Sequence, residues 1–315
     1  MPLKILILGK GQLGQALSAY FKAKPQWQVS FAGHNEADIK DIASLERLID
    51  KEKPDIIINT AALTNLDFCE ENPLETFSIN TLGADNVGAV CQKRNIYLVH
   101  ISSGCIQESL SADEAHSEDD PPNPISFYAW TKVWAEQLLL GRAAHRGKSS
   151  DLPSPLRLLI LRPRQLLGTT VSPRNTLAKM LTYTKFVDTP NSCTVIEDLL
   201  QAAEKLIIKN ANGVFNVVNP GITTPYEIAL MLKKVIKPDM AVQKISKQEL
   251  NQMTKAKRID SVLKTDKLAS YGINVPEIHE RLPKIIQELK DNLALNKTPE
   301  ILNQIAQETK NKLLS

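Results

Sequence analysis

Apolar runs of strand length, alternating with helical segments, restrict the fold of this chain more than any other feature. The first run, "KILILG", ends in a glycine turn and is followed by "QALSAYFKA", which has helical spacing. Similar runs recur as "WQVSFAG", "DIIINTA", "IYLVHIS", "LRLLILRP" and "GVFNVVNP". Strands that are apolar throughout are buried on both faces. The pattern predicts an α/β fold with a Rossmann-type doubly wound parallel sheet and right-handed crossovers.

The regular alternation ends after Pro163, where short helices and loops mix, and this predicts a smaller C-terminal substrate lobe joined to the sheet. We expect a cofactor domain over residues 1–165 with a contribution from about 186–220, and a substrate lobe over 166–185 and 221–290. We expect residues 291–315 to be a helical C-terminal extension, and the stretch Arg281–Ser315 predicts two amphipathic helices separated at Lys297–Pro299. The segment Arg142–Pro155 is rich in Gly, Ser, Pro and charge, and it predicts a surface loop rather than a linker because a strand follows at once.

Charge and cysteine content exclude several classes of partner. The 38 basic and 35 acidic residues give a net charge of +3 without a long basic stripe, so we expect no nucleic acid partner. No apolar segment reaches the roughly 18 residues that a membrane span needs, and the N-terminus does not resemble a signal peptide. The 4 cysteines do not have zinc-site spacing, so we expect no metal, reduced thiols and a cytoplasmic protein.

The turn "GKGQLG" places Gly9, Gly11 and Gly14 in a G-x-G-x-x-G pattern between the first strand and the first helix. Such glycines allow a sharp turn and a close backbone approach, while the helix N-terminus supplies N–H groups for a pyrophosphate. Gln12 and Leu13 lie within the same turn and belong to the candidate site. We therefore predict a dinucleotide site, with a purely structural glycine turn as the alternative.

The end of the second strand bears on the choice of cofactor. An acidic residue that binds a ribose hydroxyl is expected there, but the sequence has Gly33, His34 and Asn35. Without a carboxylate the 2′-phosphate of NADPH is not repelled, which favours NADPH over NADH, although no arginine is present to bind it. Asp38 and Ile39 are candidate adenine contacts.

Tyr128 and Lys132 in "FYAWTKVW" are four residues apart on an expected helix, and so they share one face. A phenol has a pKa of about 10, and it becomes a useful acid near neutral pH when an adjacent ammonium stabilises the phenolate. Ser102 or Ser103, at the end of the preceding strand, is positioned to bond the same substrate oxygen. The alternative is an exposed helical pair without a catalytic role.

The order of glycine turn, "INTAA", serine-bearing strand end and Y-x-x-x-K resembles the extended short-chain dehydrogenase/reductase family over roughly residues 1–290. The resemblance implies NAD(P) on the Rossmann domain, a sugar nucleotide in the smaller lobe, and a homodimer as one assembly. It also implies that Asn59, Ala61 and Ala62 line the cofactor and that Asn80 is structural. By the same resemblance, Ser103, Tyr128 and Lys132 form the reductase triad.

Six further stretches resemble the nucleotide-rhamnose synthase branch of that family, among them "SGCI", "SPRNTLAKM" and "VDTPNSCTVIEDLL". This branch epimerises C3 and C5 of an NDP-4-keto-6-deoxyhexose and reduces C4 to give NDP-L-rhamnose. The resemblance implies Cys105, two residues after Ser103, as the base, and Lys179, after P-R-N, as the opposing acid. A cysteine thiol has a pKa of about 8.5 and acts as a base when a nearby cation favours the thiolate.

The alternative for Cys105 is a small buried hydrophobe, and for Lys179 it is a solvated helix face. We expect Cys69, Cys91 and Cys193 only to pack. In relatives an aromatic residue usually occupies the position of Gln107. The candidate sugar or diphosphate contacts are Thr64, Ser103, Gly104, Arg174, Asn175 and Arg258.

Two other functions stay open at this stage. One is a 4-reductase similar to dTDP-4-dehydrorhamnose reductase, in which Cys105 only packs. The other is a non-catalytic, cofactor-binding regulatory subunit that docks through the C-terminal helices, although intact Tyr128 and Lys132 count against it. The sequence does not distinguish a UDP sugar from a dTDP sugar.

Overall fold

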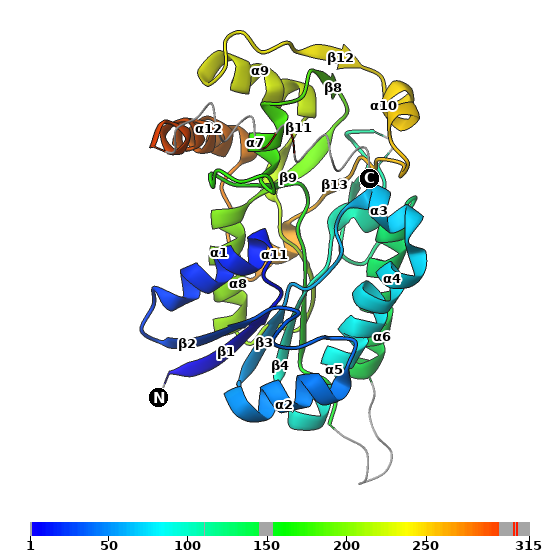
Figure 1. Ribbon diagram of the computed structural model, residues 1–315, viewed down its shortest axis with the longest axis vertical. Helices are drawn as coiled ribbons and strands as arrows, with labels where there is room; N and C mark the ends of the chain where they lie inside the picture. Colours follow the sequence, from blue (N-terminus) through cyan, green and yellow to red (C-terminus); the bar gives the residue numbers. More distant parts are fainter. Residues whose placement is uncertain (1, 110, 145–153, 296–304, 306, 308–315) are drawn as a thin grey trace.

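A six-stranded parallel sheet forms the centre of the protein, with strand order β10-β6-β4-β3-β1-β2 (Figure 1). The computed structural model describes residues 2–109, 111–144, 154–295, 305 and 307. Most of the predicted surface loop Arg142–Pro155, at residues 145–153, lies outside this range, and Arg142–Ala144 are helical. The strands of the sheet are β1 (Leu3–Leu8), β2 (Trp27–Ala32), β3 (Ile56–Asn59), β4 (Tyr97–Ile101), β6 (Leu158–Arg162) and β10 (Gly213–Asn216).

The strand order reverses at β1, which has β2 on one side and β3 on the other. The register pairs Leu8 with Ala32 in one direction and with Asn59 in the other, so the carboxyl ends of these three strands lie at one edge. Open α/β sheets bind ligands at such a switch point. The predicted doubly wound parallel sheet is confirmed, and its topology places a ligand crevice beside the glycine turn.

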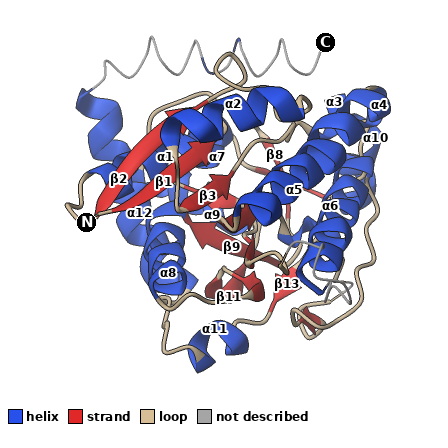
Figure 2. Ribbon diagram, turned by 90° about the horizontal axis from the view of Figure 1, so that it is seen from below, coloured by secondary structure: helices blue, strands red, loops and turns tan. Residues whose placement is uncertain are grey.

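Helices cover both faces of the sheet, as Figure 2 shows from below. One face packs against α1 (Gln12–Lys22) and α8 (Ile196–Ile208). The other packs against α2 (Ile42–Glu52), α5 (Ala84–Arg94) and α6 (Phe127–Ala144). Side chains alternate along each strand, so Ile5 and Ile7 enter the first core and Leu6 and Leu8 the second. Both faces are therefore buried, as the apolar runs predict.

A smaller lobe carries the remaining sheets and a core of its own, which confirms the predicted additional lobe. Its strands and helices are β7 (Leu166–Leu167), α7 (Thr176–Met180), β8 (Lys185–Val187), β9 (Asn191–Val195), β11 (Asn219–Thr223), α9 (Pro225–Val235), β12 (Gln243–Ile245), α10 (Lys247–Met253) and α12 (Ile278–Leu295). Helix α12 continues past residue 290, the expected end of the lobe. The domain boundaries stay a prediction, and most of the second expected C-terminal helix lies outside the described residues.

Residues 259–263, here called the crossing segment, tie the lobe to the end of β4. Within it β13 (Val262–Leu263) pairs with β5 (Ala115–His116). The Ser261 hydroxyl donates to the Gly104 carbonyl at 2.9 Å, and the Val262 N–H donates to the Ser109 hydroxyl at 2.9 Å. The Ser192 N–H donates to the Ser261 carbonyl at 2.8 Å. The turn after β4 is thus held by hydrogen bonds from both parts of the chain.

Short helices complete the fold: α3 (Leu66–Glu71), α4 (Pro73–Phe77), a π-helix (Ser78–Gly83) and a 3₁₀ turn η2 (Gly104–Ile106). Helix α11 (Asp266–Ser270) packs against the edge strand β10. Within the described ranges, no helix combines the length and apolarity that a bilayer crossing requires.

Candidate active site

The glycine turn is built so that two glycines are required by packing and one faces open space. Gly9 has φ +101°, and a Cβ there would lie 2.7 Å from the Ala61 nitrogen. A Cβ on Gly14 would lie 1.9 Å from the Gly9 carbonyl oxygen. At Gly11, by contrast, an added Cβ meets no atom within 4 Å. Since Gly11 precedes the first turn of α1 and its N–H groups, this open space suits a pyrophosphate.

Gln12 is a second residue of this crevice whose surroundings suit a bound ligand. Its Nε2 atom is buried and has no hydrogen-bond partner in the described part of the chain. An unpaired buried donor costs free energy that a ligand oxygen recovers. The first turn of α1 carries no acidic side chain that would repel an anion. The predicted contacts Gly9, Gly11, Gln12, Leu13 and Gly14 therefore fit the pyrophosphate of a nicotinamide dinucleotide.

The turn after β3 lies directly beside the glycine turn. Asn59 accepts a hydrogen bond from the Ala61 N–H at 3.1 Å, while the Thr60 hydroxyl donates to the Gly9 carbonyl at 3.0 Å. Asn80, in the π-helix, accepts from the Leu63 N–H at 2.8 Å. These bonds fix the backbone of Ala61 and the half-buried Ala62 at the carboxyl edge of the sheet. The side chain of Asn80 thus has the structural position that the family resemblance implies.

The expectation that no carboxylate stands at the end of β2 is wrong. The chain bends back after Gly33, so that the Gly33 N–H donates to Glu36 Oε2 at 2.8 Å. Glu36 also forms an ion pair with Lys10 of the glycine turn. The Lys10 ammonium, followed by the Gly33 N–H, lowers the pKa of Glu36. The sequence did contain this carboxylate, as Glu36, three residues after Gly33. It was missed because it does not directly follow the strand.

The adenine candidates lie close to this bend. Ile39 is buried, and a Cβ on Gly83 would meet its Cδ1 atom at 2.7 Å, so its side chain mainly packs against the π-helix. Asp38 accepts a hydrogen bond from the Lys40 N–H at 2.9 Å and stays partly exposed. Asp38 therefore has the freer side chain of the two.

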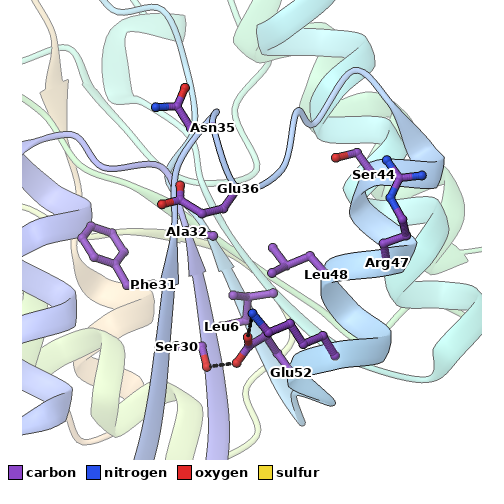
Figure 3. A pocket seen from close by; sticks show the side chains of 11 residues that line it. Leu6, Ser30, Phe31, Ala32, Asn35, Glu36, Ser44, Arg47, Leu48 and Glu52 are labelled. Atoms are coloured by element: carbon purple, nitrogen blue, oxygen red, sulfur yellow. Dashed lines mark hydrogen bonds and ion pairs between the residues drawn. The ribbon is translucent and has the colours of Figure 1, made fainter.

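A cavity of about 590 Å³ opens at the outer edge of the sheet, between β2 and α2 (Figure 3). Glu36 and Asn35 line one end, and a hydrogen bond from Ser30 to Glu52 marks the other. Neither Ser103 nor Tyr128 lines it. The cavity reaches the candidate cofactor site only at the bend after β2 and contains none of the expected catalytic groups.

Helix α6 buries Tyr128, Lys132 and Glu136 along one face, with relative exposures of 8%, 2% and 2%. This burial rules out the alternative of an exposed Tyr–Lys pair. The Ser103 side chain lies beside Tyr128, close enough to affect its pKa. Burial raises the pKa of Tyr128, and the Ser103 side chain and the charge of Arg164 oppose that increase. Ser102 instead donates to the Glu136 carboxylate, so Ser103 is the serine beside the phenol.

Lys132 is held at the end of β4, where its ammonium donates to the Ile101 carbonyl at 2.8 Å. Burial lowers the pKa of Lys132 from 10.5 to about 8, and the charge of Glu136 opposes that decrease. The ammonium of Lys132 therefore loses its proton far more readily than that of an exposed lysine. Such a group is suited to exchange protons at an active site.

Cys105 lies next to the Tyr128 side chain. Its N–H donates to the Ser103 hydroxyl oxygen at 3.1 Å, and its side chain is 9% exposed. Cys105, Tyr128, Cys69 and Ile259 belong to one buried cluster. The structure thus brings Ser103, Cys105 and Tyr128 together, from one strand end and one helix.

The other three cysteines are free thiols buried in the protein. Burial raises the pKa of Cys69, Cys91 and Cys193, in the last case to about 12. A raised pKa keeps a thiol protonated and unreactive. Their environment matches the packing role expected from the sequence.

The "PRNTLAK" segment forms the start of α7. Asn175 caps this helix, and its side chain donates to the Gly168 and Thr170 carbonyls at 2.7 and 2.6 Å while its oxygen accepts from the Leu177 N–H at 2.9 Å. That amide is thus engaged within the protein. Arg174 is exposed and donates to the Lys10 carbonyl at 3.2 Å, beside the glycine turn. Lys179 is half-buried on α7.

The remaining sugar or diphosphate candidates differ in their freedom to bind a ligand. Arg258 pairs with Asp67 at 2.6 Å, and its Nη1 atom is buried without a partner among the described residues. Thr64 is exposed at the start of α3. Gly104 is buried, and a Cβ there would lie 2.5 Å from Leu263 Cδ1. Gln107 is buried and donates to the Ser117 and Asp120 carbonyls, which makes it a loop anchor.

Two groups near the site escaped the sequence reasoning. Glu136 forms a buried ion pair with Arg162 at 2.6 Å, directly below Lys132 on α6. Arg164, two residues past the end of β6, is 9% exposed and lies near Tyr128. The positions of Arg162 and Arg164 near this site depend on which strands pair in the sheet. Local sequence patterns do not predict strand pairing. Across the described part of the chain, no cluster of three or more His, Cys, Asp or Glu side chains is arranged to bind a metal ion.

A glycine turn at a β1/β3 switch point, together with buried Ser, Tyr and Lys side chains, is typical of Rossmann-fold reductases. Comparison with known proteins agrees with this class. Residues 3–291 match the model of the RmlD substrate-binding domain, and the chain belongs to that family.

Similar proteins include the L780 protein of Acanthamoeba polyphaga mimivirus, which is 28% identical over 302 residues that cover 91% of this chain and 99% of the relative. The crystal structure of this viral UDP-rhamnose synthase has a TM-score of 0.80, at 27% identity, and covers 91% of this chain and 100% of the other. A bifunctional dTDP-4-dehydrorhamnose 3,5-epimerase/reductase of Arabidopsis thaliana is 29% identical, with coverage of 79% and 82%. A Bacillus anthracis dTDP-4-dehydrorhamnose reductase shares the fold, with a TM-score of 0.78, 24% identity and coverage of 91% and 100%.

Proposed function

We propose that the protein is a bifunctional, NADPH-dependent sugar-nucleotide enzyme. It epimerises C3 and C5 of an NDP-4-keto-6-deoxyhexose and reduces C4 to form NDP-L-rhamnose. The observation that carries this proposal is the contact of Ser103, Cys105 and Tyr128 in one buried site. The similarity to a UDP-rhamnose synthase and to a bifunctional epimerase/reductase supports it.

In the reduction, Tyr128 is the acid. A bound nicotinamide cofactor supplies the hydride to C4, and the Tyr128 hydroxyl delivers its proton to the C4 oxygen. The Ser103 hydroxyl, which lies beside Tyr128, orients the same carbonyl. Lys132, whose pKa burial lowers to about 8, holds the ribose side of the cofactor one helical turn from Tyr128.

In the epimerisation, Cys105 is the base and Lys179 the acid. The Cys105 thiolate removes the proton at C3 or C5, and the electrons of the broken C–H bond pass to the C4 oxygen as an enolate. Ser103 and Tyr128 donate hydrogen bonds to that oxygen. The Lys179 ammonium then protonates the carbon from the opposite face. Inversion therefore introduces a solvent-derived hydrogen at each carbon.

The cofactor preference rests on Lys10. Lys10 belongs to the glycine turn and reaches the bend after β2, so its ammonium is positioned to attract a 2′-phosphate. We propose NADPH over NADH on this ground, with Glu36 weakening the preference. The free, buried thiols suit the proposed cytoplasmic location. A homodimer is a proposal from the family resemblance alone.

Deuterium exchange tests the epimerase step. Incubation of the wild type with NDP-4-keto-6-deoxyglucose in deuterated water should label C3 and C5, as read by NMR of the sugar. Cys105→Ala should abolish labelling and still reduce the pre-epimerised 4-keto sugar. Cys69→Ala is the matched control, because it removes a second thiol from the same cluster and should leave labelling intact. A wild type that reduces the pre-epimerised sugar without labelling would disprove epimerisation.

A 4-reductase without epimerase activity is the second candidate. The burial of Cys105 among apolar side chains favours it, because a free buried cysteine usually packs as a small hydrophobe. This candidate predicts NADPH oxidation only with the pre-epimerised sugar. A non-catalytic regulatory subunit predicts no oxidation with any keto sugar.

A further inference from the structure

Arg164 follows β6 and lies behind the turn that carries Ser103 and Cys105. The Gly104 N–H donates to the Pro163 carbonyl at 2.8 Å, which fixes the two strand ends together. A Cβ on Gly104 would lie 3.3 Å from Arg164 Cβ and 3.6 Å from its Cδ. The aliphatic stem of Arg164 therefore packs against the turn itself.

The guanidinium of Arg164 is held in one place. Its Nη2 atom donates to Asn191 Oδ1 and to the Ile259 carbonyl, both at 2.7 Å. Ile259 also contributes its side chain to the cluster that contains Cys105 and Tyr128. These two short bonds at Nη2 fix the orientation of the planar guanidinium.

The positive charge of Arg164 has no carboxylate partner within ion-pair distance among the described residues. The nearest acid of its network, Asp260, pairs with Lys247 and bonds Asn191. The Nε atom of Arg164 is buried and lacks a hydrogen-bond partner within the same residues. Burying an arginine in this way is unfavourable unless an anion forms nearby.

Tyr128 is the group next to this guanidinium that becomes an anion during the reduction, because Ile259, whose carbonyl binds Arg164, packs in the same cluster as Tyr128. Arg164 lowers the pKa of Tyr128 against the larger effect of burial, whereas the nearby Cys105 and Cys69 thiols raise it. Lys132, the cation expected to serve Tyr128, bonds the Ile101 carbonyl, and no hydrogen bond joins it to the phenol in the described chain. Arg164 is therefore a second cation near Tyr128, in addition to the lysine of the Y-x-x-x-K pattern.

We propose that Arg164 is a positioning residue whose fixed charge stabilises the negative charge on the Tyr128 oxygen after that group has protonated the sugar C4 oxygen. The Tyr128 O–H bond breaks, the new O–H bond forms on the substrate, and the phenolate later regains a proton from water. The inference rests on the proposed 4-keto reduction, but it does not require epimerisation.

The test compares Arg164→Met, which keeps the stem without the charge, with Arg164→Lys, which keeps a charge. Using the pre-epimerised sugar, Arg164→Met should lower kcat by about 10-fold, because a lost charge near a titrating group is worth about 1 pKa unit. The KM of the sugar and the Kd of NADPH should change far less. Arg164→Lys should restore most of the rate at neutral pH.

The pH profile separates a charge from a packing role. The arginine stays charged at all working pH values, whereas the substituted ammonium loses its proton in alkali. Arg164→Lys should therefore lose activity at alkaline pH beyond the loss that Lys132 imposes on the wild type. The other titrating or charged groups around Arg164 are Tyr128, Cys193 and, through Asn191, the Asp260–Lys247 pair, and these are common to both proteins.

Arg157→Met is the matched control. Arg157 lies at the opposite end of β6, 5.2 Å from the Tyr97 ring and away from Tyr128, so this variant should keep kcat. A wild-type kcat in Arg164→Met would overturn the inference, as would an Arg164→Lys profile identical to that of the wild type. If Arg164→Met fails to fold, the alkaline profile of Arg164→Lys decides alone. A wild type that reduces no keto sugar would instead disprove the proposed function.

Discussion

The Glu136 carboxylate lies 2.6 Å from Nη2 of Arg162, and both side chains are buried between α6 and the sheet. Glu136 also accepts a hydrogen bond from Ser102 at the end of β4. The pair therefore joins α6 to two neighbouring strands, one helical turn from Lys132. The position of the Tyr–Lys face relative to the strand ends depends on this pair.

Glu136→Gln should destabilise the protein strongly, because it leaves the Arg162 charge buried and unpaired. Breaking one side of a buried ion pair costs about 3–5 kcal/mol. Urea unfolding followed by circular dichroism measures the loss. Glu46→Gln, which removes an exposed pair with Lys93, is the control and should cost at most about 1 kcal/mol. Equal effects of the two changes would contradict the importance of the buried pair.

Lys132→Met should abolish reduction and yet stabilise the folded protein. In the unfolded chain the lysine has its ordinary pKa, whereas burial lowers the folded pKa to about 8. The native state therefore carries a penalty for charge at neutral pH, and the gain on removing it is about 2 kcal/mol after loss of the Ile101 bond. The advantage of the variant should shrink between pH 8 and pH 10.5, where the wild type releases the proton on folding. A variant less stable than the wild type at pH 7 would contradict this.

Two glycine substitutions separate cofactor binding from folding. Gly11→Ala places its methyl group in open space, so the thermal midpoint should change little while NADPH affinity falls by about tenfold or more, because the methyl occupies the pyrophosphate position. Gly14→Ala collides with the Gly9 carbonyl and should lower the midpoint itself. Fluorescence titration with NADPH and calorimetry of the free protein give the two readouts. Unchanged NADPH affinity in Gly11→Ala would place the pyrophosphate elsewhere.

Lys10→Met should weaken NADPH binding by about tenfold and leave NADH binding nearly unchanged, because only NADPH has a 2′-phosphate for the ammonium to attract. Glu36→Gln should shift the ratio of the two dissociation constants in the opposite direction. Titration of both cofactors against each variant measures the ratio. If Lys10→Met weakens both cofactors equally, Lys10 contacts a group that they share.

Local patterns predicted the central features of this molecule. Continuous apolar runs predicted the sheet, and period-3.6 spacing predicted its covering helices. The i, i+4 spacing placed Tyr128 and Lys132 on one face, which the structure buries. The glycine turn was recognisable because its residues are consecutive. The residue pattern alone left Ser102 and Ser103 open, and the family resemblance favoured Ser103. The structure distinguishes them by the bond between Ser102 and Glu136.

The sequence could not reveal relationships that depend on strand adjacency or chain reversal. Arg162 and Arg164 reach the site only because β6 pairs with β4. Glu36 approaches Lys10 only because the chain bends after β2. Asn175 looked like a ligand contact by residue type, but its amide is used to cap α7. Polar residues that hold loops and polar residues that bind ligands are alike in sequence, and only their bonding distinguishes them.

The crossing segment has a consequence for how the protein unfolds. Ser261 and Val262 bond the turn after β4, while Ser192 of the smaller lobe bonds Ser261. Unfolding of either the sheet domain or the smaller lobe would break hydrogen bonds that stabilise the other. We therefore expect cooperative unfolding, with a single calorimetric transition and equal calorimetric and van't Hoff enthalpies. A fragment that ends before residue 259 would lack the crossing segment, which bonds the turn that carries Gly104 and Cys105. Even if its sheet still forms, this fragment should expose that turn to solvent.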